Sequence, residues 1–166
     1  ETGIAPECLK LEITESAVME NAENAVKVLN RIKELGVRIS IDDFGTGYSS
    51  LSYLHRFPID MLKIDRSFVS SMEEGSENGE IVRTVIALAK ALNLGVIAEG
   101  IESIHQFHQL RILGCDYGQG YLFSRPIPVA EVNKLLEDPH RWQNILPVND
   151  FGVIARNLEY TQLRLQ

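Results

Sequence analysis

The sequence predicts an α/β fold in which parallel strands alternate with helices; one observation predicts this alternation, and a second favours a β/α barrel over an open doubly wound sheet. Helical stretches with an apolar stripe end at glycine and are followed at once by short β-rich runs, and this unit recurs along the chain. Polar residues fall late in the strands, where the strand ends of a β/α barrel form one rim. Five strands are recognised, whereas such a barrel needs about eight, so we expect the first strands and helices to lie outside this chain.

The first strand is predicted at residues 9–15, which read LKLEITE, and the first helix at residues 21–35. The helix places apolar residues at three- and four-residue intervals and stops at Gly36. The second strand, VRISIDD at residues 37–43, ends in two acids. Because the loop FGTGYSS follows it directly, its glycines permit a tight, irregular turn.

A short helical turn is predicted around residues 51–56, and a strand with the sequence MLKID at residues 61–65. Ser103 and Gln106 fit a capping box that opens the last predicted helix. The unit of helix, glycine and strand therefore recurs in two later places: helix 80–92 before strand 96–100, and helix 103–113 before strand 115–123.

Composition fits one ordinary globular domain, with 45% hydrophobic and 23% charged residues. No apolar stretch approaches the roughly 18 residues of a membrane span, so we expect a cytoplasmic domain, whether or not its parent protein is membrane-anchored. The net charge of -7 argues against a partner that is a nucleic-acid polymer.

Cys8 and Cys115 lack metal-site spacing and are predicted to be buried free thiols. The alternation is lost after Trp142, so residues 143–166 are predicted to be an extension.

Acidic residues at the strand ends predict a metal-binding active site. Hard divalent ions prefer carboxylate oxygens, and two ions about 4 Å apart need a carboxylate that bridges them. Asp42 and Asp43 are adjacent acids at a strand end, and the glycines after them let the backbone turn so that both face the rim. Such a pair can merely start a turn, but polar residues end the other strands too. The residues at these positions are Glu12, Glu15, Asp42, Asp43, Lys63, Asp65, Glu99 and Gln119.

Individual residues have competing interpretations. A lysine inside a barrel is costly unless it faces anions or metal-bound water, so a functional role is favoured for Lys63. Asp65 lies two residues on and shares its strand face, so a structural salt bridge between the two is equally open. Glu99 and Glu102 could instead be first-turn helix acids favoured by the helix dipole, and for Glu102 this alternative stays open.

Five short runs occur in a fixed order and spacing over about residues 7–136: LEITES, IDDFGTGYSSL, LKIDRSF, VIAEGIE and QGYLFSRP. Together they resemble the EAL domain family, the bacterial phosphodiesterases specific for cyclic di-GMP. The resemblance implies a modified TIM-type β/α barrel in which two Mg²⁺ or Mn²⁺ ions activate a water that attacks one phosphodiester, giving linear pGpG. It implies that residues 1–142 are the C-terminal part of this domain, about two thirds, in a homodimer whose parent protein has an upstream sensory or GGDEF-type domain.

The resemblance also assigns roles position by position. Glu12 matches a ligand of one metal, Asp42 matches the acid shared between the metals, and Asp43 matches a ligand of the second. Lys63 would orient the nucleophilic water. Glu99 matches the essential acid that binds metal or receives the proton of the water. Residues expected to support the site or to contact the substrate are Glu15, Asp65, Glu102, Gln119 and Arg125.

Glu15 resembles the glutamate that anchors the FGTGYSS loop, which in this family takes part in dimerisation and in completing the metal site. The Glu-Ala-Leu tripeptide, whose glutamate ligates metal in the family, does not occur in this chain, and a metal-binding asparagine also comes from an earlier strand. We therefore expect hydrolysis by the intact domain and little or none by these 166 residues alone. Two alternatives stay open: a non-catalytic receptor for cyclic di-GMP, and an interaction module that dimerises through the loop after Asp43.

Overall fold

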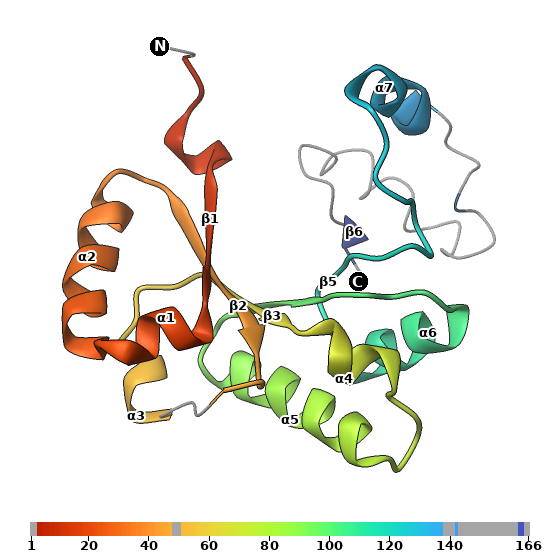
Figure 1. The fold of residues 1–166 in the computed structure, drawn as a ribbon, viewed down its shortest axis with the longest axis horizontal. Helices are drawn as coiled ribbons and strands as arrows, with labels where there is room; N and C mark the ends of the chain where they lie inside the picture. The colour runs from red at the N-terminus through yellow and green to blue at the C-terminus, as the bar shows by residue number, and fades with distance from the viewer. Residues whose placement is uncertain (1–2, 48–50, 138–141, 143–162, 165–166) are drawn as a thin grey trace.

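The computed structural model of the chain describes residues 3–47, 51–137, 142 and 163–164. Helices and strands alternate along most of it (Figure 1). The strands are β1 (Lys10–Thr14), β2 (Arg38–Phe44), β3 (Met61–Ile64), β4 (Gly95–Ala98), β5 (Tyr117–Gly118) and β6 (Leu163–Arg164). The helices are the 3-10 helix η1 (Pro6–Cys8), α1 (Glu15–Glu20), α2 (Ala22–Glu34), α3 (Leu51–Leu54), α4 (Arg66–Ser70), α5 (Glu77–Ala91), α6 (Ile104–Leu113) and α7 (Val129–Glu137).

The strands form one sheet in the order β1-β2-β3-β4-β5-β6. Strands β1 to β5 pair in parallel, and β6 pairs antiparallel to β5. Chain order and spatial order coincide, as in a β/α barrel, whereas a doubly wound sheet reverses its strand order at a switch point. The predicted α/β fold with five parallel strands is confirmed. The sixth strand lies in the predicted extension, of which residues 143–162 and 165–166 are outside the described residues.

Capping residues fix where the longer helices begin and end. Helix α5 begins three residues before its predicted start because the Ser76 side chain accepts a hydrogen bond from the Gly79 backbone N–H at 3.0 Å. Helix α6 has the predicted capping box of Ser103 and Gln106. It ends at Gly114, whose φ of 76° lies in the left-handed region that glycine adopts without strain.

Two short helices directly after strands were not predicted, because five or six residues are too few to display a helical period. Glu15, predicted as the last residue of the first strand, instead begins α1. Asp65, predicted to end a strand, caps α4 by accepting a hydrogen bond from the Ser67 backbone N–H at 2.9 Å. The predicted strand at 115–123 is shorter than expected, since only β5 is extended.

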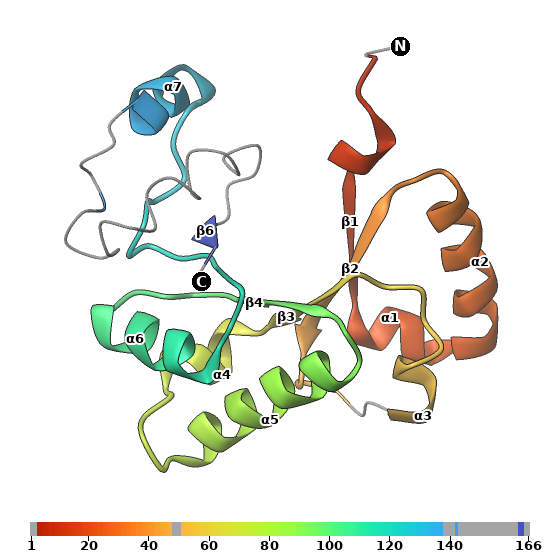
Figure 2. The same cartoon turned by 180° about the vertical axis from the view of Figure 1, so that it is seen from behind.

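The apolar core lies between the sheet and the helices. Helix α2 packs on β2, and α5 packs on β3 and β4; Figures 1 and 2 show α1, α2 and α3 beside β1 and β2. Ile39 and Ile41 of β2 are fully buried in this core. Because strand side chains alternate, Ser40 and Asp42 point to the opposite face, which would be the interior of a barrel.

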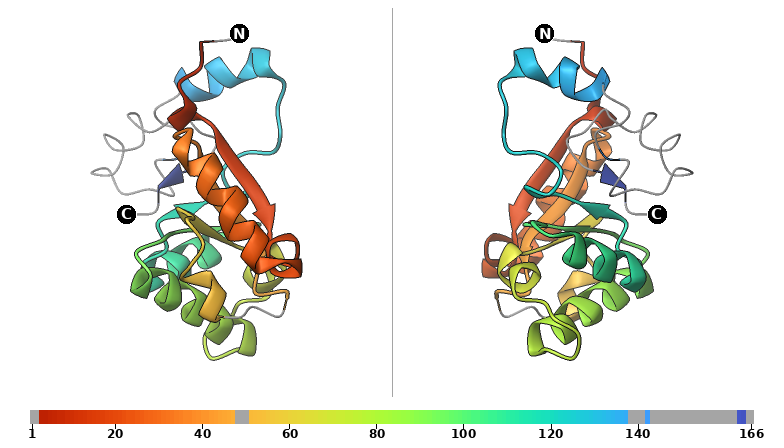
Figure 3. Two further views of the ribbon diagram at one scale, coloured as in Figure 1. Left: turned by 90° about the vertical axis from the view of Figure 1, so that its left-hand side faces the viewer. Right: turned by 90° about the vertical axis from the view of Figure 1, so that its right-hand side faces the viewer.

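Both cysteines are free thiols. Cys115 is buried, as predicted, but Cys8 is exposed in η1, so its predicted burial is wrong. Seen from the side, the N-terminus and α7 lie at one end of the molecule and α5 lies at the other (Figure 3). None of the helices in the described part of the chain is both long and apolar enough to span a membrane.

Candidate active site

Four charged side chains from four neighbouring parallel strands meet at the carboxyl ends of those strands. Glu12 lies in β1, Asp42 in β2 and Lys63 in β3, and Glu99 directly follows β4. The Nζ atom of Lys63 is 2.5 Å from Glu12 Oε2, 3.0 Å from Asp42 Oδ1 and 2.7 Å from Glu99 Oε1. The Lys63 ammonium group is thus surrounded by residues as far apart in the sequence as Glu12 and Glu99, which are 87 positions apart. We call these four residues the Lys63 cluster.

The ammonium at the centre is buried, while its partners reach solvent. The Lys63 side chain is 4% exposed, against 37% for Glu12 and 20% for Glu99. Burial alone would lower the pKa of Lys63, but hydrogen bonds to Glu12, Glu99 and Asp42 outweigh it and hold the pKa above its usual range. Burial raises the pKa of Glu99, against the opposing charge of Lys63. Lys63 therefore stays charged, and Glu99 is the acid whose affinity for a proton is increased.

Regular strand conformation ends between Asp42 and Asp43. Asp43 has a left-handed backbone with φ 53°, and the register between β2 and β3 shifts between Ile41 and Phe44. In a regular strand the two carboxylates would face opposite sides of the sheet; the left-handed residue and the register shift remove that alternation. The glycines of the following loop were expected to supply this turn. Instead it begins at Asp43 itself, and Gly45, with φ 99°, continues it.

Asp43 and Asp65 form a second acidic pair, and each affects the pKa of the other. Burial and the charges of Asp42 and Asp65 raise the pKa of Asp43, whereas Lys63 opposes this. Burial would also raise the pKa of Asp65, but hydrogen bonds from Ser67 reverse the direction and lower it. The alternative of a structural Lys63–Asp65 salt bridge is wrong, because the ion pairs of Lys63 are those of the Lys63 cluster.

Glu15 holds the loop that follows Asp43. Its side chain is buried, and its Oε2 accepts hydrogen bonds from the backbone N–H of Gly45 at 2.9 Å and of Gly47 at 3.4 Å. A Cβ atom at Gly47 would lie 3.2 Å from the carboxyl carbon of Glu15, so the loop approaches the carboxylate closely. Residues 48–50, the rest of the predicted FGTGYSS loop, lie outside the described residues.

The other predicted site residues, Glu102, Gln119 and Arg125, have exposed side chains. Glu102 precedes the cap of α6, so the interpretation as a first-turn helix acid is wrong; its backbone N–H donates to Gln106 Oε1 at 2.8 Å. Gln119 directly follows β5, and its backbone N–H donates to the last residue of β4 at 2.9 Å. The Arg125 guanidinium stacks 4.7 Å from the ring centre of Tyr121.

Lys10 belongs to this neighbourhood and was missed. Its Nζ is 3.6 Å from Glu12 Oε1, and burial lowers its pKa, although Glu12 opposes that shift. The signal for it was available: Lys10 and Glu12 are two apart in a strand, so their side chains share a face. A second positive charge therefore lies beside the most exposed acid of the Lys63 cluster.

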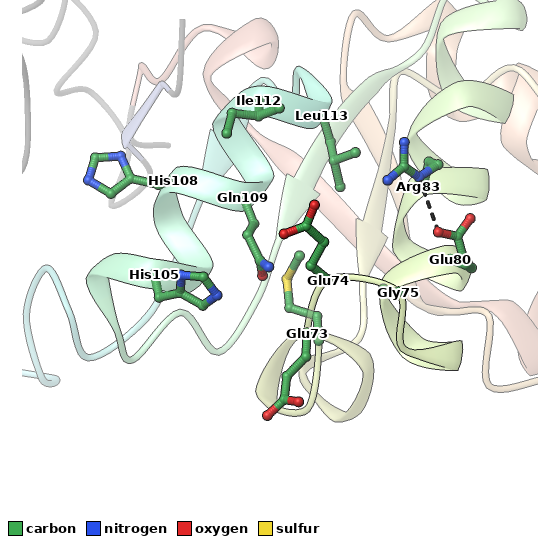
Figure 4. A pocket seen from close by; sticks show the side chains of 12 residues that line it. Glu73, Glu74, Gly75, Glu80, Arg83, His105, His108, Gln109, Ile112 and Leu113 are labelled. Carbon is green, nitrogen blue, oxygen red and sulfur yellow. Dashed lines mark ion pairs between the residues drawn. The ribbon is translucent and has the colours of Figure 1, made fainter.

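Two cavities among the described residues lie away from the Lys63 cluster. One, of about 240 Å³, opens between the loop after α4 and helices α5 and α6; Figure 4 shows Gln109 and Glu74 around it. Its lining includes His105 and His108, both exposed. Another, of about 640 Å³, lies between α1 and α2. Neither is lined by any residue of the Lys63 cluster.

The donor set at the rim consists of carboxylate oxygens, which suits hard divalent cations. Among the described residues, no three His, Cys, Asp or Glu side chains are grouped so that they could hold a metal ion. The physical reason is that Glu12, Asp42 and Glu99 are turned onto the Lys63 ammonium. The ammonium groups of Lys63 and Lys10 do not balance these three acids together with Asp43 and Asp65, and burial together with the charges of Asp42 and Asp65 raises the pKa of Asp43. The residues present therefore fit oxygen-bound divalent cations.

The fold and the site together define a β/α-barrel type of protein with an acidic centre at the carboxyl rim of its strands. The family model described as the EAL domain matches residues 1–126. The chain belongs to the EAL domain family, and the resemblance found in the sequence is confirmed.

Two curated relatives carry a named activity. The chain is 48% identical over 136 residues to the cyclic di-GMP phosphodiesterase NbdA of Pseudomonas aeruginosa, covering 82% of this chain and 17% of NbdA. It is 46% identical over 122 residues to the cyclic di-GMP phosphodiesterase PdeR of Escherichia coli, covering 74% of this chain and 18% of PdeR. The chain thus spans less than a fifth of the length of these relatives.

Solved structures agree with the fold. The PaMucR phosphodiesterase in complex with c-di-GMP has a TM-score of 0.75 and 45% identity, over 78% of this chain and 52% of that one. The manganese and cyclic di-GMP complex of Klebsiella pneumoniae BlrP1 has a TM-score of 0.69 and 36% identity, over 75% of this chain and 32% of that one. Since the EAL domains among these neighbours are TIM-like barrels, the predicted fold class is confirmed.

Proposed function

We propose that the intact domain hydrolyses cyclic di-GMP to linear pGpG with the help of two divalent cations, Mg²⁺ or Mn²⁺. The observation that carries this proposal is the convergence of Glu12, Asp42 and Glu99 on Lys63 at the rim of an EAL-family sheet. Support comes from NbdA and PdeR, which are named phosphodiesterases for this nucleotide, and from BlrP1, which was solved with manganese and the nucleotide.

The cations would be held by Glu12, Asp42, Asp43 and Glu99, with Asp42 shared between them. When bound, they would neutralise the phosphodiester and lower the pKa of the attacking water. Charge balance supports this, because the chain carries a net charge of -7 and its nucleotide would be a dianion. The left-handed backbone at Asp43 places a second carboxylate beside Asp42, and such strain is typical of functional sites.

Lys63 and Glu99 would have different roles toward the attacking water, Lys63 as a hydrogen-bond donor and Glu99 as the proton acceptor. Lys63 keeps its proton, because the surrounding acids hold its pKa above the usual range, so its ammonium acts only as a donor. Once cations neutralise the acids, that ammonium is available to orient the nucleophilic water. Glu99 has its pKa raised by burial, which suits a group that receives the proton of that water.

The remaining residues would support the rim or contact the nucleotide. Glu15 would fix the loop after Asp43, and Asp65, which caps α4, would support the rim beside Asp43. Glu102, Gln119 and Arg125 are exposed and are proposed as support or substrate contacts.

The wider context is likewise a proposal. We propose a cytoplasmic domain, formed in part by residues 1–142 and followed by an extension at 143–166, in a homodimer built through the loop after Asp43. An upstream sensory or GGDEF-type domain is supported by MucR of Pseudomonas aeruginosa, a bifunctional diguanylate cyclase and phosphodiesterase that is 45% identical over 130 residues. Because the Glu-Ala-Leu tripeptide does not occur in these residues, we expect little turnover by this chain alone.

Turnover of cyclic di-GMP by the intact domain tests the proposal. We expect pGpG to accumulate with Mn²⁺ or Mg²⁺ and to fall at least about 100-fold in Glu99→Gln, which keeps the shape of the side chain but cannot accept the proton. Calorimetric titration with cyclic di-GMP separates the alternatives. Binding without turnover would indicate a receptor, and the absence of both would indicate an interaction module.

A further inference from the structure

Both the oxygen and the nitrogen of the Gln106 side-chain amide form hydrogen bonds. Its Oε1 accepts hydrogen bonds from the backbone N–H of Glu102 at 2.8 Å and of Ser103 at 2.9 Å. Its Nε2 donates to the backbone carbonyl of Val69 at 3.2 Å and of Ser70 at 3.5 Å. A capping box needs only the first of these interactions. The second joins α6 to α4, two helices that lie side by side (Figures 1 and 2).

The hydrogen-bond partners at each end of this amide belong to a segment that directly follows a member of the Lys63 cluster. The carbonyls of Val69 and Ser70 end helix α4, which begins directly after Asp65, two residues beyond Lys63. On the other side, the N–H groups belong to the segment that leaves β4 at Glu99. The amide therefore ties the two polypeptide segments that carry Lys63 and Glu99 beyond the end of the sheet.

Hydrogen bonds to α4 matter for the segment after Glu99 because this segment contains Gly100, a residue about which the backbone can turn. Gly100 has φ 72°, and a Cβ atom there would lie 2.6 Å from the Cβ of Arg66 at the start of α4. Glycine permits this close approach, but it also has the widest conformational freedom of any residue. The hydrogen bond from Ile101 N to Gln119 O at 3.1 Å holds this segment to the end of β5, and the hydrogen bonds on both sides of Gln106 hold it to α4.

We infer that Gln106 is a positioning residue for the hydrolysis, one that keeps Glu99 in place opposite Lys63. This inference rests on the proposed function and adds a residue that touches neither the cations nor the nucleotide. The amide is suited to the task because it accepts and donates at once. Glutamate at this position would keep the acceptor for Glu102 and Ser103 but would lose the donor for Val69 and Ser70.

Gln106→Glu in the intact domain therefore separates the two functions of the side chain. The capping box is retained, since glutamate serves in it as well as glutamine does and favours a helix N-terminus. Ser103→Ala is the matched control: it removes the hydrogen bond from Gln106 N to Ser103 Oγ and weakens the same helix, but leaves the tie to α4 intact.

We expect kcat for pGpG formation to fall about tenfold in Gln106→Glu, with KM changed less than threefold and Tm close to that of the wild type, because small displacements of reacting groups are costly. Ser103→Ala should lower Tm by a few degrees and leave kcat within about twofold. Equal kcat in Gln106→Glu and wild type, or an equal loss of kcat in Ser103→Ala, would overturn the inference.

Amide hydrogen exchange gives a readout that does not depend on turnover. The N–H of Ile101, which donates to Gln119 O at 3.1 Å, should exchange at least about fivefold faster in Gln106→Glu and not in Ser103→Ala. Unchanged exchange in Gln106→Glu would refute the tie even if that variant or the wild type proved inactive. Absence of turnover in the wild type itself would instead contradict the proposed function.

Discussion

Replacing Lys63 by methionine should destabilise the fold strongly in the absence of divalent cations and much less in their presence. The substitution preserves most of the apolar stem and removes the one ammonium that faces Glu12, Asp42 and Glu99 at 2.5 to 3.0 Å. Without cations, Asp42 and Glu99 then lose their ion-pair partner, and Glu12 keeps only Lys10 at 3.6 Å. With cations, the acids gain the partners that we propose for them.

The size of the effect follows from burial. Removing one partner of a buried ion pair costs about 3–5 kcal/mol, but Glu12, Asp42 and Glu99 are 37%, 24% and 20% exposed, so water offsets part of that cost. We expect a loss of about 2–3 kcal/mol without metal, which for a domain of this size lowers Tm by about 4–12 °C. Saturating Mn²⁺ should recover at least half of this deficit, since binding to the folded state stabilises it.

The pH range of the experiment follows from the sign of the shift. The pKa of Lys63 is raised in the folded protein, so its contribution to stability is complete below the unfolded pKa of about 10.4 and is lost only as pH rises through the folded value. The metal-free wild type should therefore retain the Lys63 contribution in full between pH 7 and 9.

Thermal unfolding of Lys63→Met and wild type in EDTA and in Mn²⁺ is the assay. Lys33→Met is the control, because Lys33 binds Asp60 at 2.7 Å outside the Lys63 cluster, and its smaller loss should not respond to Mn²⁺. Equal stability of Lys63→Met and wild type in EDTA, or a deficit that Mn²⁺ leaves unchanged, would refute the reasoning.

Two further predictions concern other parts of the fold. Burial raises the pKa of Cys115 to about 12. At pH 8, iodoacetamide should therefore label the exposed Cys8 and reach Cys115 only after unfolding. The contribution of the Cys115 thiol to stability is present below the unfolded pKa of about 8.5 and declines above it. Labelling followed by mass spectrometry checks this, and equal labelling of both thiols in the native state would disagree with it. Gly120→Ala should cost at least about 3 kcal/mol, because its Cβ would lie 2.1 Å from the Ile101 carbonyl oxygen. Gly75→Ala, with open space around it, should cost only about 1–2 kcal/mol of backbone strain, and equal denaturation midpoints for the two variants would contradict this.

The sequence could predict the sheet and the position of the acids because both depend on short-range patterns. Strands that alternate with helices dictate parallel pairing, and parallel strands bring their carboxyl ends to one edge. Glu12, Asp42, Lys63 and Glu99 were therefore expected to meet, and they do.

What the sequence could not predict depends on tertiary contacts and on backbone conformation at single residues. The left-handed conformation of Asp43 coincides with the register shift between β2 and β3, which no local sequence pattern indicates. The pairing of Asp65 with Asp43 instead of Lys63 follows from the end of β3 at Ile64, where alternation ceases. The tie from Gln106 to α4 joins residues 37 positions apart.

The dependence of pGpG formation on Mn²⁺ concentration tests the central claim most directly. In the intact domain the initial rate should be zero in EDTA and should saturate with Mn²⁺. Asp43→Asn should need at least about tenfold more Mn²⁺, because one carboxylate ligand is lost while the left-handed backbone is tolerated by asparagine. Turnover that persists in EDTA, or an identical Mn²⁺ dependence in Asp43→Asn, would contradict the account of a metal-dependent site built on Asp42 and Asp43.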